Sequence, residues 1–402
     1  NSNYCTARNI VIRYGNDGIR TPGVNNCIFE DIVVYYMGET KNGEVIYPEF
    51  SDGFAPASGN IGSSNINVRR YVAFNYASGA VGAGSSQNTL YEYNVGFNGG
   101  KRKSGESWVP QYACQDGSNP SPTGYPIGSG IGNCADSEGF KVGNHVPPNG
   151  ICDNIIVRNT IGFGINGYGM DPRNCLPSAY YNNVLYRNSG FGMSTGGGDG
   201  HYIVNTVSYG NSANDDIRGG GIPSSMDYNL WGSGSRATDG PNTIYGQTPL
   251  FTAPDLIKTI ADIDPNGDGE IDVSEIGYVQ NKIKQAFSLQ LGSPAIDKGT
   301  ITPYHCTESD DLGNGASQTN CIHWYGTAPD IGAFEYVPTQ IPVGAIFVDQ
   351  NIGVASCSDY NPASGCGSGS YRAYQTITGA AGVAVFGETV LIRGGVYNQR
   401  LQ

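Results

Sequence analysis

Residues 154–169 read NIIVRNTIGFGINGYG, and this stretch decides the fold. It holds short runs of alternating apolar residues, the aromatic residues Phe163 and Tyr168, and asparagines and glycines between the runs. Alternation with period two is typical of strands, and Asn and Gly tolerate the backbone angles of tight turns. The same order returns in NCIFEDIVVYYMG (26–38), NINVRRYVAFNYASGAVG (65–82), NTLYEYNVGFNGG (88–100), AYYNNVLYRNSGFGM (179–193) and HYIVNTVSYGNSANDDIRGGG (201–221).

A second, glycine-centred column can be aligned through these repeats, and several of its steps are 25 or 26 residues long. Its tetrapeptides begin at Asp17, Asp52, Ser78, Glu138, Phe163, Ser189 and Asp215. Two longer steps indicate loops inserted near residues 36–50 and 99–135. A repeat of this length with short strands is typical of a solenoid, in which stacked coils share one core. We therefore predict an all-β fold, a right-handed parallel β-helix.

One asparagine follows the aromatic residue in four of the repeats. Stacked amides could form a ladder inside a turn, which would satisfy buried polar groups. The residues expected in this ladder are Asn75, Asn98, Asn188 and Asn211.

Composition narrows the classes of function. The chain has 402 residues, 60 of them Gly, and a net charge of −13. An acidic chain repels nucleic acid, and no apolar run has the length of about 20 residues that spans a membrane. Ten cysteines predict a secreted or cell-surface protein. The simplest connectivity is five local disulfides, Cys5–Cys27, Cys114–Cys134, Cys152–Cys175, Cys306–Cys321 and Cys357–Cys366, although sequence alone does not fix the pairing.

The carboxyl-terminal part predicts an unusual domain order. We expect β-helix coils over 1–251, a helical insert over 252–290, a closing segment over 291–336, a linker over 337–344, and an amino-terminal cap with a first coil over 345–402. The beginning of a β-helix thus follows its end. The chain could be circularly permuted, could be a window from a tandem array, or could complete a neighbouring molecule head to tail, which would build a filament.

Residues 264–275 read DPNGDGEIDVSE, the pattern of an EF-hand calcium loop. The residues at loop positions 1, 3, 5, 7, 9 and 12 are Asp264, Asn266, Asp268, Glu270, Asp272 and Glu275, with Glu270 contributing its carbonyl. Gly269 occupies position 6, where the loop turns sharply. We expect bound Ca²⁺ to stabilise this insert. A dockerin-type partner site would need two such repeats, and the sequence has one.

Two segments resemble the polysaccharide lyases of family nine, which are pectate lyase-like β-helices. SEGFKVGNH around Lys141 resembles the strand that presents the catalytic lysine, and FSDGFAP around Asp52 resembles a calcium-binding strand. The resemblance covers about residues 9–231. It implies β-elimination at a uronate, with Lys141 as the base and Asp52 as a calcium ligand. The family has an aspartate cluster in the following coil, whereas residues 76–84 read YASGAVGAG.

Further roles complete this hypothesis. Arg173 and Arg218 are candidates for neutralising substrate carboxylates, and Glu138 and Asn166 for binding substrate, with Glu138 also a possible calcium ligand. An alternative is a non-catalytic structural or adhesive protein that assembles head to tail into filaments. A glycosidase is a third hypothesis, because an acid and a second carboxylate could come from Glu138, Asp171, Asp199, Asp215 and Asp216.

Overall fold

The computed structural model describes most of the chain. The described residues are 4–15, 17–37, 52–55, 62–76, 79–83, 86–99, 101–104, 107–110, 137–142, 152–165, 167–172, 175, 177–194, 200–211, 217–218, 225–233, 239–302, 327–336, 346–361, 365–367, 371–384 and 390–392. The chain divides into two compact units, Asn1–Tyr336 and Val337–Gln402.

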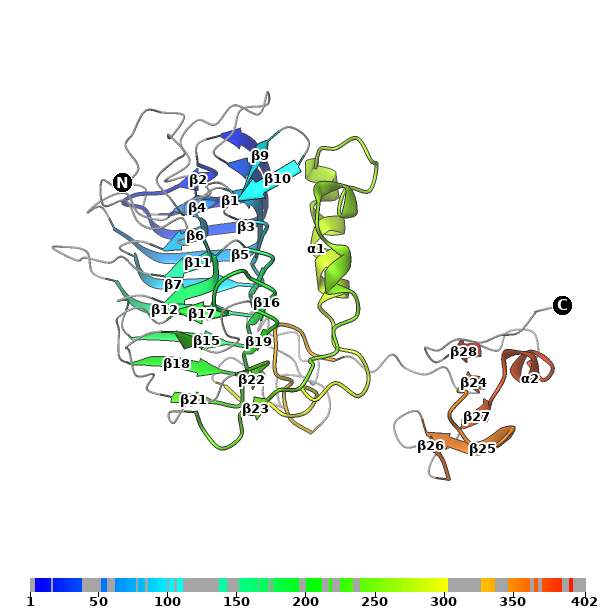
Figure 1. The fold of residues 1–402 in the computed structure, drawn as a ribbon. Helices are drawn as coiled ribbons and strands as arrows, with labels where there is room; N and C mark the ends of the chain where they lie inside the picture. The colour runs from blue at the N-terminus through cyan, green and yellow to red at the C-terminus, as the bar shows by residue number, and fades with distance from the viewer. Residues whose placement is uncertain are drawn as a thin grey trace. The chain divides into compact units, whose positions relative to one another are not determined.

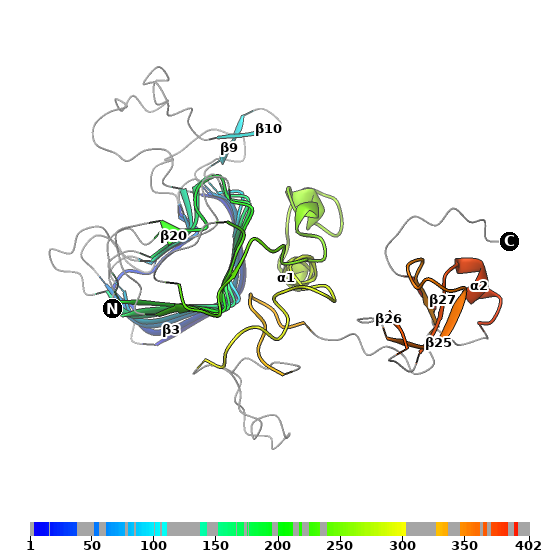
Figure 2. The same ribbon diagram turned by 60° about the horizontal axis from the view of Figure 1, so that its bottom comes forward.

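The first unit is an all-β parallel β-helix, as predicted. Its strands stack as parallel rungs (Figure 1), and Figure 2 shows successive coils nearly superimposed. Fourteen strands form the largest sheet: β1 (Cys5–Gly15), β3 (Asn25–Met37), β5 (Ser63–Tyr76), β7 (Ser86–Glu92), β8 (Val95–Phe97), β12 (Asp153–Arg158), β13 (Ile161–Phe163), β15 (Ser178–Tyr181), β16 (Val184–Tyr186), β18 (His201–Val204), β19 (Val207–Tyr209), β21 (Ser225–Asp227), β22 (Leu230–Trp231) and β23 (Ile244–Tyr245).

A seven-stranded parallel sheet forms another wall of the coil, and we call it the short-strand face. It contains β2 (Ile19–Arg20), β4 (Phe54–Ala55), β6 (Gly79–Ala83), β11 (Ser137–Val142), β14 (Gly167–Pro172), β17 (Met193–Ser194) and β20 (Ile217–Arg218). A separate antiparallel hairpin pairs β9 (Lys101–Ser104) with β10 (Ser107–Pro110).

Each coil bends at single residues with left-handed backbone. One such corner recurs at Asn9, Asp31, Arg70, Tyr93, Asn159, Asn182, Asn205 and Tyr228, all with φ between 50° and 56°. A second follows at Tyr14, Tyr36, Asn75, Asn98, Gly164, Arg187 and Gly210, and a third at Asn26, Asn65, Asn88 and Asn154. Asn and Gly adopt this conformation with less strain than other residues, which explains their abundance.

The register between coils differs from the sequence alignment at three places. Ser178 pairs with His201, so the basic coil has 23 residues, and the steps of 25 or 26 were wrong. On the short-strand face Phe54 pairs with Val81, Phe140 with Met170, and Met170 with Met193. The glycine-centred column therefore does not continue through the tetrapeptides that begin at Ser78, Phe163 and Ser189. Glycine occurs both in the corners and in the column, so sequence offered several equivalent registers.

Close backbone approach explains the column itself. A Cβ atom on Gly53 would lie 2.5 Å from the carbonyl oxygen of Ala80, and one on Gly139 would lie 2.3 Å from that of Gly169. These separations are shorter than van der Waals contact, so glycine is required there for packing.

The asparagine ladder is confirmed in part. Asn188 donates from Nδ2 to Oδ1 of Asn211 at 3.0 Å. Asn98 instead donates to the carbonyl of Lys258 in the insert, and Asn75 is buried with no hydrogen-bond partner for its amide among the described residues. A ladder that sequence reasoning missed uses Asn94, Asn183 and Asn229, whose amides each bond the backbone of the preceding coil.

A helical insert packs on the outside of the largest sheet (Figures 1 and 2). It contains η1 (Pro254–Leu256), η2 (Ile260–Asp262), η3 (Val273–Glu275) and α1 (Ile276–Ala286). Phe287 follows α1 and meets the ring of Phe163 at 4.8 Å, so a second hydrophobic core lies between insert and sheet. No helix in the described part of the chain has the length and hydropathy needed to cross a membrane.

The second unit has its own small sheet and helix. Its elements are β24 (Ile346–Val348), β25 (Ser356–Asn361), β26 (Gly365–Cys366), β27 (Tyr371–Tyr374), α2 (Ile377–Ala381) and β28 (Val390–Ile392). β24 pairs in parallel with both β27 and β28, and Ala380 of α2 packs with Ile346 and Val348.

Three of the five expected disulfides are formed, and they fit a protein made in an oxidising compartment. Cys5–Cys27 and Cys152–Cys175 each link neighbouring coils, and Cys357–Cys366 lies in the second unit. The expected pairs Cys114–Cys134 and Cys306–Cys321 lie outside the described residues.

The corner hypothesis can be tested at Asn65, which is exposed and has φ of 54°. Asn65→Val should lower the free energy of unfolding by about 1–2 kcal/mol, because a β-branched residue is strained in this conformation. Asn65→Gly, the matched control, should be close to wild type. Urea unfolding measures both, and equal stability of the two variants would contradict a left-handed requirement.

Candidate functional site

Lys141 and Glu138 form an ion pair on β11. The Lys141 Nζ lies 3.5 Å from Glu138 Oε1; the lysine side chain is 30% exposed, and Glu138 is fully buried. In the register, Lys141 stands between Gly82 of β6 and Asp171 of β14. Lys141 is therefore partly exposed, paired with one carboxylate, and next in register to a second acidic residue.

Asp52 lies beside Gly79 and Gly82 of β6, two residues without side chains. Its Oδ1 accepts a hydrogen bond from the Gly79 amide at 3.0 Å, and a Cβ on Gly82 would be 2.9 Å from its Oδ2. Its neighbour in the stack is therefore Gly79, not Ser78 as aligned from sequence. Parallel strands are about 4.8 Å apart, so the backbones at Asp52 and Glu138, two strands apart, are separated by about 10 Å.

An acidic and basic pair continues the row before Asp52. The Asp17 carboxylate bonds the Asp52 amide at 3.3 Å and pairs with Arg20 at 3.0 Å. Along the short-strand face the charged residues thus follow in the order Arg20 and Asp17, then Asp52, then partly exposed Lys141 with buried Glu138. Gly79 and Gly82 lie between Asp52 and this last pair. We call these residues, together with Asp171, the charged row.

Two buried phenols lie beneath the charged row, and sequence reasoning missed them. Tyr71 and Tyr76 are completely buried, and their hydroxyls have no hydrogen-bond partner among the described residues. Burial raises the pKa of both well above the usual value, with a smaller contribution from Asp52 at Tyr71 and from Glu138 at Tyr76. Both phenols therefore stay neutral, and each keeps an O–H group that can donate a hydrogen bond.

For the other residues predicted for this site, the structure gives a backbone position or nothing. Arg218 belongs to β20, three strands along from Lys141 in the register, and its side chain lies outside the described residues. Arg173 and Asn166 also lie outside the described residues, as does Asp199.

The loop at 264–275 is organised around Asp264. One of its carboxylate oxygens accepts the amides of Asn266 at 3.1 Å and Gly267 at 2.9 Å, and the other accepts that of Gly269 at 2.7 Å. Glu275 accepts the Asp272 amide at 2.8 Å. Gly267 and Gly269 have φ of 75° and 83°, which side-chain-bearing residues rarely adopt.

The donor set of this loop suits a hard cation. Asp264 and Glu275, at its two ends, are each only 8% exposed, and every candidate donor is an oxygen, as Ca²⁺ prefers. Among the described residues, however, no three His, Cys, Asp or Glu side chains converge as a preformed metal cluster. The loop therefore has the chemistry and the turn for calcium, with its carboxylates directed at loop amides.

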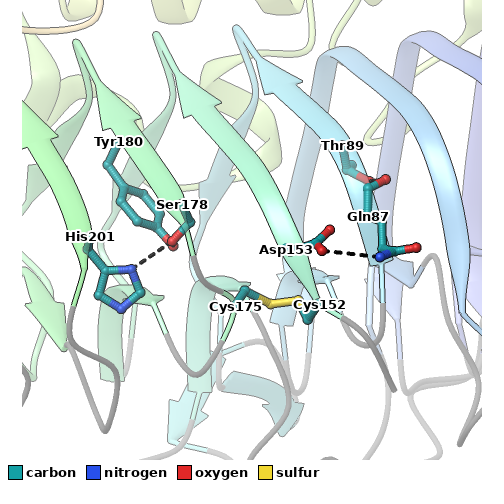
Figure 3. The surroundings of a disulfide bond; sticks show 8 residues. All are labelled: Gln87, Thr89, Cys152, Asp153, Cys175, Ser178, Tyr180 and His201. Carbon is teal, nitrogen blue, oxygen red and sulfur yellow. Dashed lines mark hydrogen bonds between the residues drawn. A yellow bond between two sulfur atoms is a disulfide. The ribbon is translucent and has the colours of Figure 1, made fainter. Parts of the chain in front are cut away.

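A serine–histidine pair near a disulfide has a structural role (Figure 3). Ser178 Oγ lies 2.7 Å from Nδ1 of His201, close to Cys152–Cys175, and both residues are buried. A nucleophile must reach substrate, and these side chains face the interior of the coil with the core residue Tyr180. We therefore assign no catalytic role to this pair.

Comparisons with known proteins include a likeness to a solved structure. No protein-family model matches the chain, and no curated protein matches it. The chain is similar to the solved crystal structure of pectate lyase Pel9A, with a TM-score of 0.43 and 15% sequence identity, over 83% of this chain and 68% of that one.

Proposed function

We propose that this protein is an extracellular β-helix that acts on or binds an acidic polysaccharide along its short-strand face. The observation that carries the proposal is the charged row, in which a partly exposed lysine adjoins buried Glu138 and a gap made by Gly79 and Gly82. A row of side chains at regular spacing suits an extended polymer better than a compact ligand.

The chemistry we propose is β-elimination. Lys141, in its neutral form, would remove the proton on the carbon next to a uronate carboxylate. A C=C bond would form as the glycosidic C–O bond at the β carbon breaks, and the leaving oxygen would take a proton from water. Arg173 or Arg218 would stabilise the negative charge that develops. Glu138 would have to exchange its bond with Lys141 for one with the substrate or a cation, and Asn166 would bind the sugar. Asp52 would hold a calcium ion that bridges to substrate. A bridging cation is needed because a chain with a net charge of −13 repels a polyanion.

Replacement of Lys141 tests this mechanism. Lys141→Ala and Lys141→Arg should each lower the release of unsaturated uronides by about 10²- to 10⁴-fold, because neither side chain can accept the proton. Lys298→Ala, at an exposed lysine of the closing segment, is the control and should retain activity. Ultraviolet absorbance of the unsaturated product measures the rate. Full activity of Lys141→Ala would refute the assigned base.

We further propose that the insert loop binds Ca²⁺ and stabilises the fold. Calcium at about a hundred times its Kd should raise the free energy of unfolding by about 2.7 kcal/mol, and chelation should remove that gain. Asp264→Asn should abolish the response, whereas Asp255→Asn, an exposed acid of the same insert, should keep it. A melting temperature that changes neither on addition of calcium nor on addition of chelator would count against the site.

A second candidate function is head-to-tail assembly. Among the described residues β1 pairs only with β3, and β28 pairs only with β24, so each unit presents a parallel strand with one open edge. Open edges invite strand addition from another chain. Light scattering and electron microscopy of the full chain should then find long uniform filaments, and a monodisperse monomer at every concentration would rule this function out.

A further inference from the structure

A column of stacked rings runs along the outside of the largest sheet, beneath the insert. Tyr35 stacks on Phe74 with ring centroids 4.9 Å apart, and Phe97 and Phe163 continue the column at the same spacing. These four residues occupy equivalent positions in successive coils. Only Tyr35 among them carries a hydroxyl, and its coil is the one beside the loop at 264–275.

The Tyr35 hydroxyl accepts a hydrogen bond from the Ile271 amide at 3.0 Å. Both residues are completely buried, so water does not compete for this bond. Ile271 follows Glu270, the loop residue whose carbonyl is the expected ligand at position 7. The Ile271 N–H and the Glu270 C=O belong to one planar trans peptide group and point in opposite directions. The bond to Tyr35 therefore fixes the direction of that carbonyl.

Arg13 strengthens the same contact. Its guanidinium donates to the Tyr35 hydroxyl at 3.3 Å and forms an ion pair with the Glu270 side chain at 2.5 Å. The hydroxyl oxygen thus accepts two hydrogen bonds, which uses both of its lone pairs. Residue 270 is consequently held at its peptide by Tyr35 and at its carboxylate by Arg13, both from the first coils of the β-helix.

We infer that Tyr35 is a positioning residue of the calcium loop, and that calcium binding at 264–275 is coupled to the packing of coils β1 and β3. This inference rests on the proposed calcium binding. If the Glu270 carbonyl were a ligand of a bound cation, its peptide group would be polarised and the Ile271 N–H would bond Tyr35 more strongly. Coupling of this kind is reciprocal. If the Tyr35 contact raises the affinity of the loop for Ca²⁺, then bound Ca²⁺ favours the Tyr35 contact by the same factor.

Tyr35→Phe tests the inference with little risk to the fold, because Phe74 already occupies the same position in the next coil. Isothermal titration of the full chain with Ca²⁺ should show a Kd about tenfold weaker, the loss typical of residues that orient metal ligands. Tyr186→Phe, at the equivalent position in the coil after Phe163 but without a bond to the loop among the described residues, is the control and should bind calcium like wild type. Arg13→Met should weaken binding in the same direction.

Melting in calcium and in chelator separates positioning from simple stabilisation. A purely structural bond would lower the melting temperature of Tyr35→Phe equally in both conditions. A positioning role would make the rise in melting temperature on adding calcium smaller in Tyr35→Phe than in wild type. If Tyr35→Phe and Arg13→Met both bind Ca²⁺ with wild-type affinity, the positioning role is wrong while the calcium site stands. If the wild-type protein does not bind Ca²⁺, both the calcium site and the positioning role are wrong.

Discussion

The structure depends on the left-handed corners of its coils. A strand must turn abruptly at the same place in each coil, or the next strand falls out of register and the shared core is lost. In the coils at Asn159, Asn182, Asn205 and Tyr228 the first corner recurs every 23 residues. Because the corners are aligned, each side chain lies above its equivalent in the coil below, which produces both the ring column and the charged row.

The same constraint places the candidate site where backbone packing is tightest. Glycines of the column let neighbouring strands approach, and Gly79 and Gly82 also remove the side chains between Asp52 and Lys141. The gap thus follows from the geometry of the wall. The short strands β4, β6, β11 and β14 keep their parallel pairing throughout this wall.

The fold was largely predictable from the sequence, because asparagine or glycine at most of the corners leaves a visible repeat. The register between coils was harder to predict. Gly164 forms a corner, whereas Gly169 lies in the tightly packed wall, and only the pairing between strands distant in sequence distinguishes the two glycines. Lys141 and Asp52 were identified from local motifs, but the buried phenols of Tyr71 and Tyr76 lack any such motif. The Tyr35–Ile271 bond joins residues 236 positions apart, which no local pattern encodes.

The insert and the charged row occupy different walls of one solenoid, so calcium-dependent rigidity and polymer recognition can be separated experimentally. The most direct test of the functional account is to incubate the wild-type protein, with calcium, with pectate, alginate and other uronate polymers, and to measure binding and the release of unsaturated ends. The account predicts binding of at least one acidic polymer with formation of unsaturated product. Absence of both binding and elimination with all of them would contradict it.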